Sequence, residues 1–293
     1  MIIKGIISAS MSVFHDNLTL DTESTIKHSE KLIKEGCHGC VLFGSTGQAQ
    51  LISSNEKKIL IEKLSASKFK SKFIIGIGSN SLNETIELMK HSIKNGLNHF
   101  LLMPPAYYKY DDNGAYSFFS NVVHKVPSAK IICYNFEKLC GYKFSIKIIE
   151  KLVKDFPEQV IGVKDSSYNL FETLQIPNFL VFPGSELKLL KGLELGCSGI
   201  ISATCNVTGP LARRVYDDFN DGRKQIYNKK LCEIRKVFDG YNLISGLHSF
   251  FSIKDKKYTK VLPPIDLLSQ TQQKELILKL KALDFNSDKN IAA

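Results

Sequence analysis

The chain has 293 residues, 43% of them hydrophobic, which is typical of one large α/β domain or two small ones. Its net charge of +10 comes almost entirely from lysines spread along helical faces, without the clustered arginines and interleaved aromatic residues of nucleic-acid-binding surfaces. No apolar run is long enough to span a membrane and the first residues lack a secretion signal, so we expect a cytoplasmic protein with no membrane or nucleic-acid partner.

Short apolar runs alternate with amphipathic segments along most of the chain. The expected strands are 3–9, 40–43, 73–77, 99–103, 130–134, 160–164, 179–182 and 199–202. The expected helices are 21–34, 53–66, 81–96, 113–125, 145–155, a short helix from about 169, 185–195 and 210–219. Asp21 or Thr22 is expected to cap the first helix, and Ser53 or Ser54, followed by Glu56, is expected to open the second in the manner of a capping box.

Eight strand–helix alternations within about 220 residues predict parallel strands that close into a (β/α)8 TIM barrel over residues 1–220. Residues 221–293 are expected to add a C-terminal helical extension packed on the barrel, most clearly at 226–238 and 272–283, with a frayed end at 286–293. The alternative is an open doubly wound sheet. That fold usually carries a G-x-G-x-x-G motif after its first strand, and this chain has none.

The seven cysteines are odd in number and irregularly spaced, which argues against a disulfide framework. Cys37 and Cys40 form a single C-x-x-C motif. In redox proteins this motif opens a helix, whereas here it leads into a strand-like segment, and no second pair completes a zinc site. We interpret it as a turn of small residues, with a metal or redox role as the alternative.

The sixth apolar run, residues 160–164, ends in a lysine. A buried strand is a short, continuous apolar run, so Lys164 stands where such a strand ends. If it faces inward, burial disfavours its charged form, and the neutral amine can attack a ketone to form a Schiff base. The alternative is a lysine whose stem packs on the strand while its amine reaches water.

Small and polar residues follow the ends of other strands, where the catalytic groups of barrel enzymes lie. Ser45 and Thr46 can hold a carboxylate through their amides and hydroxyl groups. Tyr134, at the end of the fifth strand, can hydrogen-bond a reacting group or pack in the core. Each is an ordinary turn or packing residue when taken alone. A lysine, a phenol and a hydroxyl–amide cradle are together the parts that a keto-acid aldolase needs.

Five motifs carry a family resemblance: G-S-T-G at 44–47, P-P-x-Y-Y at 104–108, Y-N at 134–135, G-V-K-D-S-S at 162–167 and G-x-I-S-A-T-x-N at 199–206. In order and spacing they resemble the dihydrodipicolinate synthase/N-acetylneuraminate lyase family of class I pyruvate-dependent aldolases. The resemblance covers roughly residues 1–220. It implies a (β/α)8 barrel, a homotetramer built as a dimer of dimers, and no metal or organic cofactor.

The resemblance also implies a role for each matching residue. Lys164 would form the Schiff base with pyruvate or another 2-keto acid, and Tyr134 would be the acid/base group. Ser45 and Thr46 would hold the keto-acid carboxylate, while Tyr107 would complete a proton relay in the site of the neighbouring subunit. The rest of the substrate would be lined by Gly184, Glu186, Ile201, Ser202 and Leu139.

Several positions depart from the family pattern. Leu139, beside Lys138, stands where the lysine-pathway synthases carry an arginine that grips the carboxylate of aspartate semialdehyde. Losing a bidentate arginine is expected to weaken binding of that substrate. A leucine here resembles the sialic acid lyases and some 2-keto-3-deoxy sugar acid aldolases. In addition, Gln48 replaces a usual glutamate near the relay, and Phe136 replaces the common small or branched residue.

We therefore predict a lyase that cleaves or forms a 2-keto-3-deoxy sugar acid through a Schiff base on Lys164. 2-Keto-3-deoxygluconate is the favoured substrate and N-acetylneuraminate the second. One alternative is 4-hydroxy-tetrahydrodipicolinate synthase, which joins pyruvate to aspartate semialdehyde with the same lysine. An alternative of another class is a non-catalytic barrel that only binds a ligand.

Overall fold

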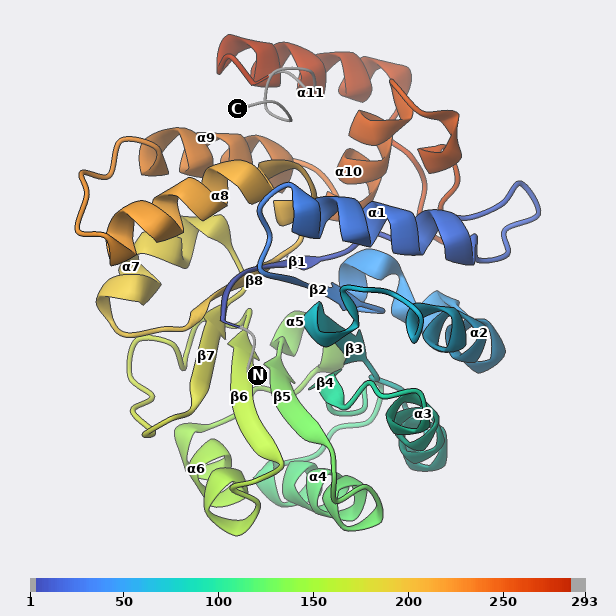
Figure 1. The fold of residues 1–293 in the computed structure, drawn as a ribbon, viewed down its shortest axis with the longest axis vertical. Coiled ribbons are helices and arrows are strands. Elements are labelled where there is room, and N and C mark those ends of the chain that lie inside the picture. The colour runs from blue at the N-terminus through green and yellow to red at the C-terminus, as the bar shows by residue number, and fades with distance from the viewer. Residues whose placement is uncertain (1–3, 286–293) are drawn as a thin grey trace.

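The computed structural model describes residues 4–285, and eight parallel strands form a barrel at its centre (Figure 1). The strands are β1 (Gly5–Ala9), β2 (Gly39–Leu42), β3 (Phe73–Gly76), β4 (His99–Leu102), β5 (Lys130–Asn135), β6 (Val160–Asp165), β7 (Leu180–Pro183) and β8 (Gly199–Ser202). They pair in the order β7-β6-β5-β4-β3-β2-β1-β8. At the seam between β7 and β8, the Ser198 amide donates to the Val181 carbonyl (2.8 Å). The predicted TIM barrel is confirmed.

Helices surround the barrel. They are α1 (Thr22–Lys34), α2 (Ser54–Leu64), α3 (Leu82–Lys94), α4 (Asp112–Lys125), α5 (Glu137–Cys140), α6 (Ile146–Asp155), α7 (Leu189–Glu194) and α8 (Cys205–Asn220). Short 3₁₀ helices are η1 (Ser45–Gly47), η2 (Ala49–Leu51), η3 (Lys70–Lys72), η4 (Glu186–Lys188) and η5 (Lys256–Tyr258). None of the helices within residues 4–285 is long and apolar enough to cross a membrane.

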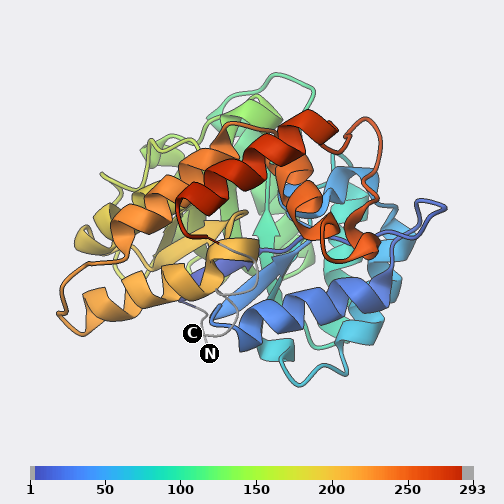
Figure 2. The ribbon, with the colours of Figure 1, turned by 90° about the horizontal axis from the view of Figure 1, so that it is seen from above.

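The C-terminal helices are α9 (Asn228–Asp239), α10 (Leu243–Ser252) and α11 (Gln270–Ala282). Figures 1 and 2 both show α9 between α8 and α11, on one side of the barrel. Their apolar faces share a core with the segment that follows β1, through Met11 and Val13. Helices after the barrel were predicted, and this shared core explains how they pack on its wall. The predicted fraying of residues 286–293 lies outside the described residues.

The capping predictions are confirmed, because short-range side-chain hydrogen bonds set these helix starts. Asp21, rather than Thr22, caps α1 by accepting from the Ser24 amide (2.9 Å). Ser53 and Glu56 form the predicted capping box of α2. Such caps satisfy backbone amides that lack a partner within the helix.

Three of the helix predictions were wrong in detail. Between residue 169 and β7 the chain forms bends and turns instead of a helix, and the Asp165 carboxylate accepts from the amides of Tyr168, Leu170 and Phe171. The segment predicted as the helix 185–195 is divided into η4 and α7. The helix predicted near Pro210 begins at Cys205, so that the proline lies inside α8. The short helix α5 was not predicted.

Candidate active site

Lys164 and Tyr134 lie side by side at the carboxyl ends of β6 and β5, where the strand ladder pairs them. The Lys164 Nζ atom is 4.1 Å from the centroid of the Tyr134 ring, and each residue is only 4% exposed. The hydroxyl oxygens of Ser45 and Tyr134 are 3.2 Å apart. The structure therefore brings together an amine, a phenol and a hydroxyl group from three separate loops or strands.

Asp165 fixes the position of its neighbour Lys164 and was not among the predicted site residues. Its side chain is fully buried and accepts hydrogen bonds from three backbone amides of the following turn. The same carboxylate accepts from the Asn135 side-chain amide (2.8 Å), which ties the end of β6 to the end of β5. The aspartate after the lysine in the G-V-K-D-S-S motif was a visible signal of this turn.

A cavity of about 510 Å³ opens over Lys164 and Tyr134. A neighbouring cavity of about 420 Å³ shares Ser45, Tyr134, Leu139 and Ile244 with it, so the two form one opening at the barrel mouth. Predicted residues that line the first cavity are Ser45, Thr46, Tyr134, Leu139, Lys164 and Gly184. The C-terminal helices complete its wall with Arg235, Asp239, Asn242, Leu243 and Ile244.

Four other predicted site residues lie away from this cavity surface. Ile201 is fully buried in the barrel interior, paired with Ile7 across the β1–β8 ladder. Glu186 and Ser202 are also fully buried and bond to each other (2.6 Å). Tyr107 is 87% exposed, with a left-handed φ of 84°. Its predicted contact with a neighbouring subunit stays a prediction.

Arg235 of α9 is the main site residue that the sequence did not indicate. Its Nη1 atom donates to Glu186 Oε2 and Ser202 Oγ (both 2.9 Å), and its Nε atom donates to Asp239 Oδ1 (2.8 Å). Burial alone would raise the pKa of the Glu186 carboxyl, but the guanidinium and nearby hydroxyl groups outweigh burial and hold it below its ordinary value. The one available signal was the Arg–Asp spacing of i,i+4 on a helix.

Gln48 connects the loop that carries Ser45 and Thr46 to the C-terminal extension. It is buried, with a left-handed φ of 56°, and its Oε1 accepts from the Leu262 amide (2.7 Å). Its Nε2 lies 3.3 Å from His248 Nε2, and His248 Nδ1 lies 3.1 Å from the Tyr258 carbonyl. A carbonyl only accepts, so Nδ1 carries the proton and Nε2 accepts from Gln48. Burial lowers the pKa of His248 to about 4, which keeps the ring neutral at pH 7.

We expect Gln48→Glu to destabilise the protein by about 1–3 kcal/mol, because a carboxylate cannot donate to His248 and would be buried beside it. Urea unfolding at pH 7 measures the change. Gln50→Glu is the matched control, since Gln50 also donates from Nε2, to the Gly78 carbonyl, but lies at the exposed end of the same loop. Equal costs for the two variants would contradict the importance of the buried contact.

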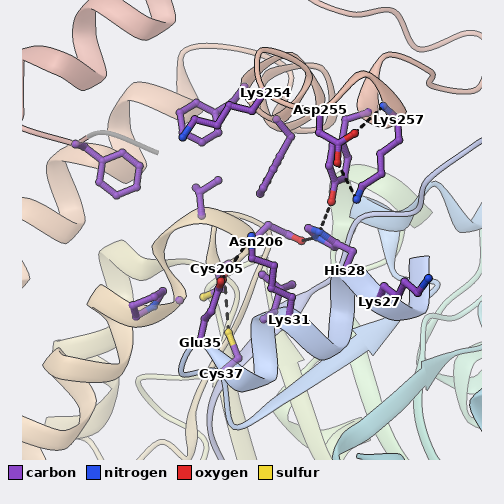
Figure 3. Close-up of a pocket in the computed structure, with 18 residues that line it drawn as sticks. Lys27, His28, Lys31, Glu35, Cys37, Cys205, Asn206, Lys254, Asp255 and Lys257 are labelled. Carbon is purple, nitrogen blue, oxygen red and sulfur yellow. Dashed lines mark hydrogen bonds and ion pairs between the residues drawn. The ribbon is translucent and has the colours of Figure 1, made fainter. Parts of the chain in front are cut away.

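A further cavity of about 260 Å³ lies outside the barrel, between α1, α8 and α10 (Figure 3). Three of the lysines that line it form ion pairs with carboxylates: Lys27 with Glu23 (2.8 Å), Lys31 with Glu35 (3.6 Å) and Lys257 with Asp255 (2.8 Å). This cavity contains none of the residues brought together at the barrel mouth.

The C-x-x-C motif contributes to this outer wall rather than to the mouth. Cys37 and Cys40 are both buried and reduced. Burial raises the pKa of the Cys37 thiol to about 12, and Cys40 Sγ donates to the Ser29 carbonyl (3.4 Å). A buried, protonated thiol is unreactive, so a packing role fits both residues better than a redox role.

Comparison with protein families and curated proteins agrees with this geometry. The model of the dihydrodipicolinate synthetase family matches residues 2–283. An uncharacterized DapA-like lyase of Thermococcus onnurineus is 27% identical, covering 94% of this chain and 98% of the relative. The 4-hydroxy-tetrahydrodipicolinate synthase of Desulforamulus reducens is 25% identical (82% and 83% covered). The N-acetylneuraminate lyase of Clostridium perfringens is 30% identical (75% and 77% covered).

Solved structures share the fold. Dihydrodipicolinate synthase from Cyanidioschyzon merolae with lysine bound superposes with a TM-score of 0.89 at 20% identity, covering 97% of this chain and 99% of that one. A family member from Escherichia coli K12 in complex with pyruvate gives a TM-score of 0.84 at 23% identity, covering 98% and 100%. At these identities the likeness shows the fold alone.

Proposed function

The chain belongs to the dihydrodipicolinate synthetase family of Schiff-base-forming, pyruvate-dependent lyases, and on that premise we propose that it cleaves or forms a 2-keto-3-deoxy sugar acid. The observation that carries this proposal is Lys164, which is buried beside Tyr134 and lines a cavity together with Leu139. 2-Keto-3-deoxygluconate is the favoured substrate. Its carboxylate is assigned to the amides and hydroxyl groups of Ser45 and Thr46.

In the first step, the Lys164 amine attacks the C2 carbonyl of the keto acid and water leaves, which forms an iminium. The walls around Nζ are formed by the Tyr134 ring and by apolar residues of the barrel interior. Lys164 is only 4% exposed, so the iminium forms away from bulk water. The positively charged iminium then accepts electrons from the bond that breaks.

Tyr134 gives its hydroxyl proton to the water that leaves in the first step, and in the second step its phenolate oxygen takes the proton from the C4 hydroxyl of the substrate. The C3–C4 bond breaks, an aldehyde leaves, and the electron pair forms an enamine of pyruvate on Lys164. Ser45, whose Oγ lies 3.2 Å from the Tyr134 hydroxyl oxygen, is placed to pass on the proton. Protonation of C3 and hydrolysis of the iminium release pyruvate and restore the lysine.

The charges around the cavity support an aldehyde half without a carboxylate. The Arg235 guanidinium is already bonded to the carboxylates of Glu186 and Asp239. Lys138 is exposed and offers a mobile point charge rather than a bidentate fork. Leu139, at 45% exposure, presents an apolar surface where the synthases use arginine. These features favour a sugar acid over aspartate semialdehyde as the partner.

The decisive experiment compares substrates. We expect pyruvate release from 2-keto-3-deoxygluconate, with N-acetylneuraminate as the second candidate because a lyase for it is among the relatives at 30% identity. Consumption of aspartate semialdehyde with pyruvate is measured in parallel, since a synthase is also a relative, at 25% identity. Faster turnover of aspartate semialdehyde than of either sugar acid would overturn the proposal in favour of the synthase.

Leu139→Arg is expected to raise the rate of aspartate semialdehyde consumption about tenfold, because a guanidinium binds a carboxylate with two charge-assisted hydrogen bonds. The position suits the change, since Leu139 lines both cavities and is partly exposed. Leu139→Met is the control, with similar volume and no charge. If the arginine variant gains nothing over methionine, residue 139 does not select the substrate.

The proposal includes a cytoplasmic homotetramer built as a dimer of dimers, in which Tyr107 enters the neighbouring subunit's site. The high exposure of Tyr107 and Tyr108 (87% and 76%) supports a contact there, since adjacent exposed aromatic side chains are typical of interfaces. Family architecture alone does not fix the assembly, because a structural neighbour with a TM-score of 0.89 is a monomeric dihydrodipicolinate synthase variant.

A further inference from the structure

We propose that Arg235 of α9 is a specificity-determining residue, which donates a hydrogen bond from Nη2 to a hydroxyl group on the aldehyde half of the substrate. The inference rests on the proposed function, because it needs a substrate attached to Lys164. Position 235 belongs to the C-terminal helices and lies outside the five sequence motifs that carry the family resemblance.

The hydrogen bonds of the guanidinium leave one nitrogen available. Nη1 donates to Glu186, Ser202 and Thr204 at 2.9–3.2 Å, and Nε donates to Asp239 at 2.8 Å. Nη2 makes no hydrogen bond within the described range 4–285. The side chain is 8% exposed, and Arg235 lines the cavity over Lys164. Because the guanidinium group is planar, hydrogen bonds that fix the positions of Nε and Nη1 also fix the position of Nη2.

Glu186 holds the Arg235 guanidinium in place. Its carboxylate is fully buried and also accepts from Ser202 (2.6 Å) and Thr208 (3.0 Å), so it cannot follow a moving arginine. Asp239 holds the other side of the guanidinium, one helical turn along α9. A donor that is already fixed in this way loses little side-chain conformational entropy when a ligand binds. Glu186, predicted as a substrate contact, is thus assigned a positioning role under Arg235.

The charge of the cluster selects the ligand. Two carboxylates flank one guanidinium, so Glu186, Arg235 and Asp239 together carry a net charge of −1. Such a cluster can donate a hydrogen bond to a neutral hydroxyl group, but it repels a second carboxylate or a phosphate. The chemical class expected at this end of the cavity is therefore an uncharged, hydroxylated aldehyde.

The test runs the reaction in the direction of synthesis, where the C3 carbon of pyruvate forms a bond to the aldehyde carbon. Glyceraldehyde is compared with propionaldehyde, which has the same chain length and no hydroxyl groups. The double variant Arg235→Met/Glu186→Gln removes the guanidinium without leaving a buried charge. We expect it to lose on the order of tenfold to a hundredfold in kcat/KM for glyceraldehyde and little for propionaldehyde.

Two controls isolate the guanidinium. Glu186→Gln alone keeps Arg235 and should keep most of the preference for glyceraldehyde. Arg213→Met is the matched control, because Arg213 also donates from Nε to an aspartate four residues on, at 2.8 Å, and lies outside the cavity. It should leave both rates unchanged. If the double variant does not fold, Arg235→Lys takes its place. This variant keeps the positive charge but lacks Nη2, so it should also lose the preference for glyceraldehyde over propionaldehyde.

The outcomes separate this inference from the proposed function. If wild-type protein treated with pyruvate and borohydride gains no adduct, the proposed function fails. If the adduct forms and the folded Arg235 variants keep the wild-type preference, only the inference is overturned. A wild-type rate for glyceraldehyde 3-phosphate above that for glyceraldehyde would overturn the charge argument, and with it the uncharged substrate class.

Discussion

Lys164→Met is expected to abolish both aldol cleavage and the adduct that borohydride traps with pyruvate. Methionine fills nearly the same space beside Tyr134 but has no amine to form the iminium. The covalent route is lost rather than slowed, so we expect a fall in kcat of roughly 10⁴-fold or more. Activity is measured as pyruvate release, and the adduct is located by peptide mass spectrometry.

A second buried lysine offers a matched control for this experiment. Lys57 of α2 is 7% exposed and burial lowers its pKa, yet it lines neither cavity at the barrel mouth. Lys57→Met should therefore trap pyruvate as the wild type does. An adduct on another lysine in Lys164→Met, with turnover retained, would show that Lys164 is not the residue that forms the Schiff base.

Arg235→Met is expected to cost about 3–5 kcal/mol of folding free energy at pH 7, because it leaves the Glu186 carboxylate buried without its cation. The double variant Arg235→Met/Glu186→Gln should recover most of this loss, since a neutral amide keeps hydrogen bonds to Ser202 and Thr208. Urea unfolding of the wild type, Arg235→Met, Glu186→Gln and the double variant measures the coupling free energy between the two side chains.

The same pair makes a prediction about pH. In the wild type the pKa of Glu186 lies below its ordinary value of 4.5, so its contribution is present above pH 4.5 and is lost as the pH falls. In Arg235→Met, burial without the guanidinium raises that pKa, so the folded state takes up a proton first. The cost of the substitution should therefore shrink between pH 7 and pH 4.5. If Arg235→Met lowered the free energy of unfolding equally at pH 7 and pH 4.5, Glu186 would not be the charged group that the substitution leaves unpaired.

The barrel could be predicted from the sequence because its signals are local. Each strand is a short apolar run, and Ser45, Tyr134 and Lys164 stand at or just after the ends of β2, β5 and β6, so chain order alone places them at one mouth. The helix expected from 169 failed for a local reason too. Only one helical turn closes there, with the amides of Thr173 and Leu174 both donating to the Leu170 carbonyl, and Pro177 follows three residues later.

The contacts from the C-terminal helices could not be predicted, because their partners are far apart in the chain. Arg235 and Glu186 are separated by 49 positions, and Gln48 and His248 by 200. An arginine on an amphipathic helix is ordinarily a surface residue. Its role here depends on where α9 packs against the barrel, and no pattern within α9 encodes that.

The anchoring of Gln48 and Glu186 by residues beyond 220 sets a lower bound on how small this catalyst can be made. A truncated gene that encodes all eight strands would still lack one wall of the cavity over Lys164 and the contact that tethers the loop carrying Ser45 and Thr46. Efforts to shorten the protein, or to transplant its loops onto another scaffold, must therefore carry the last helices along.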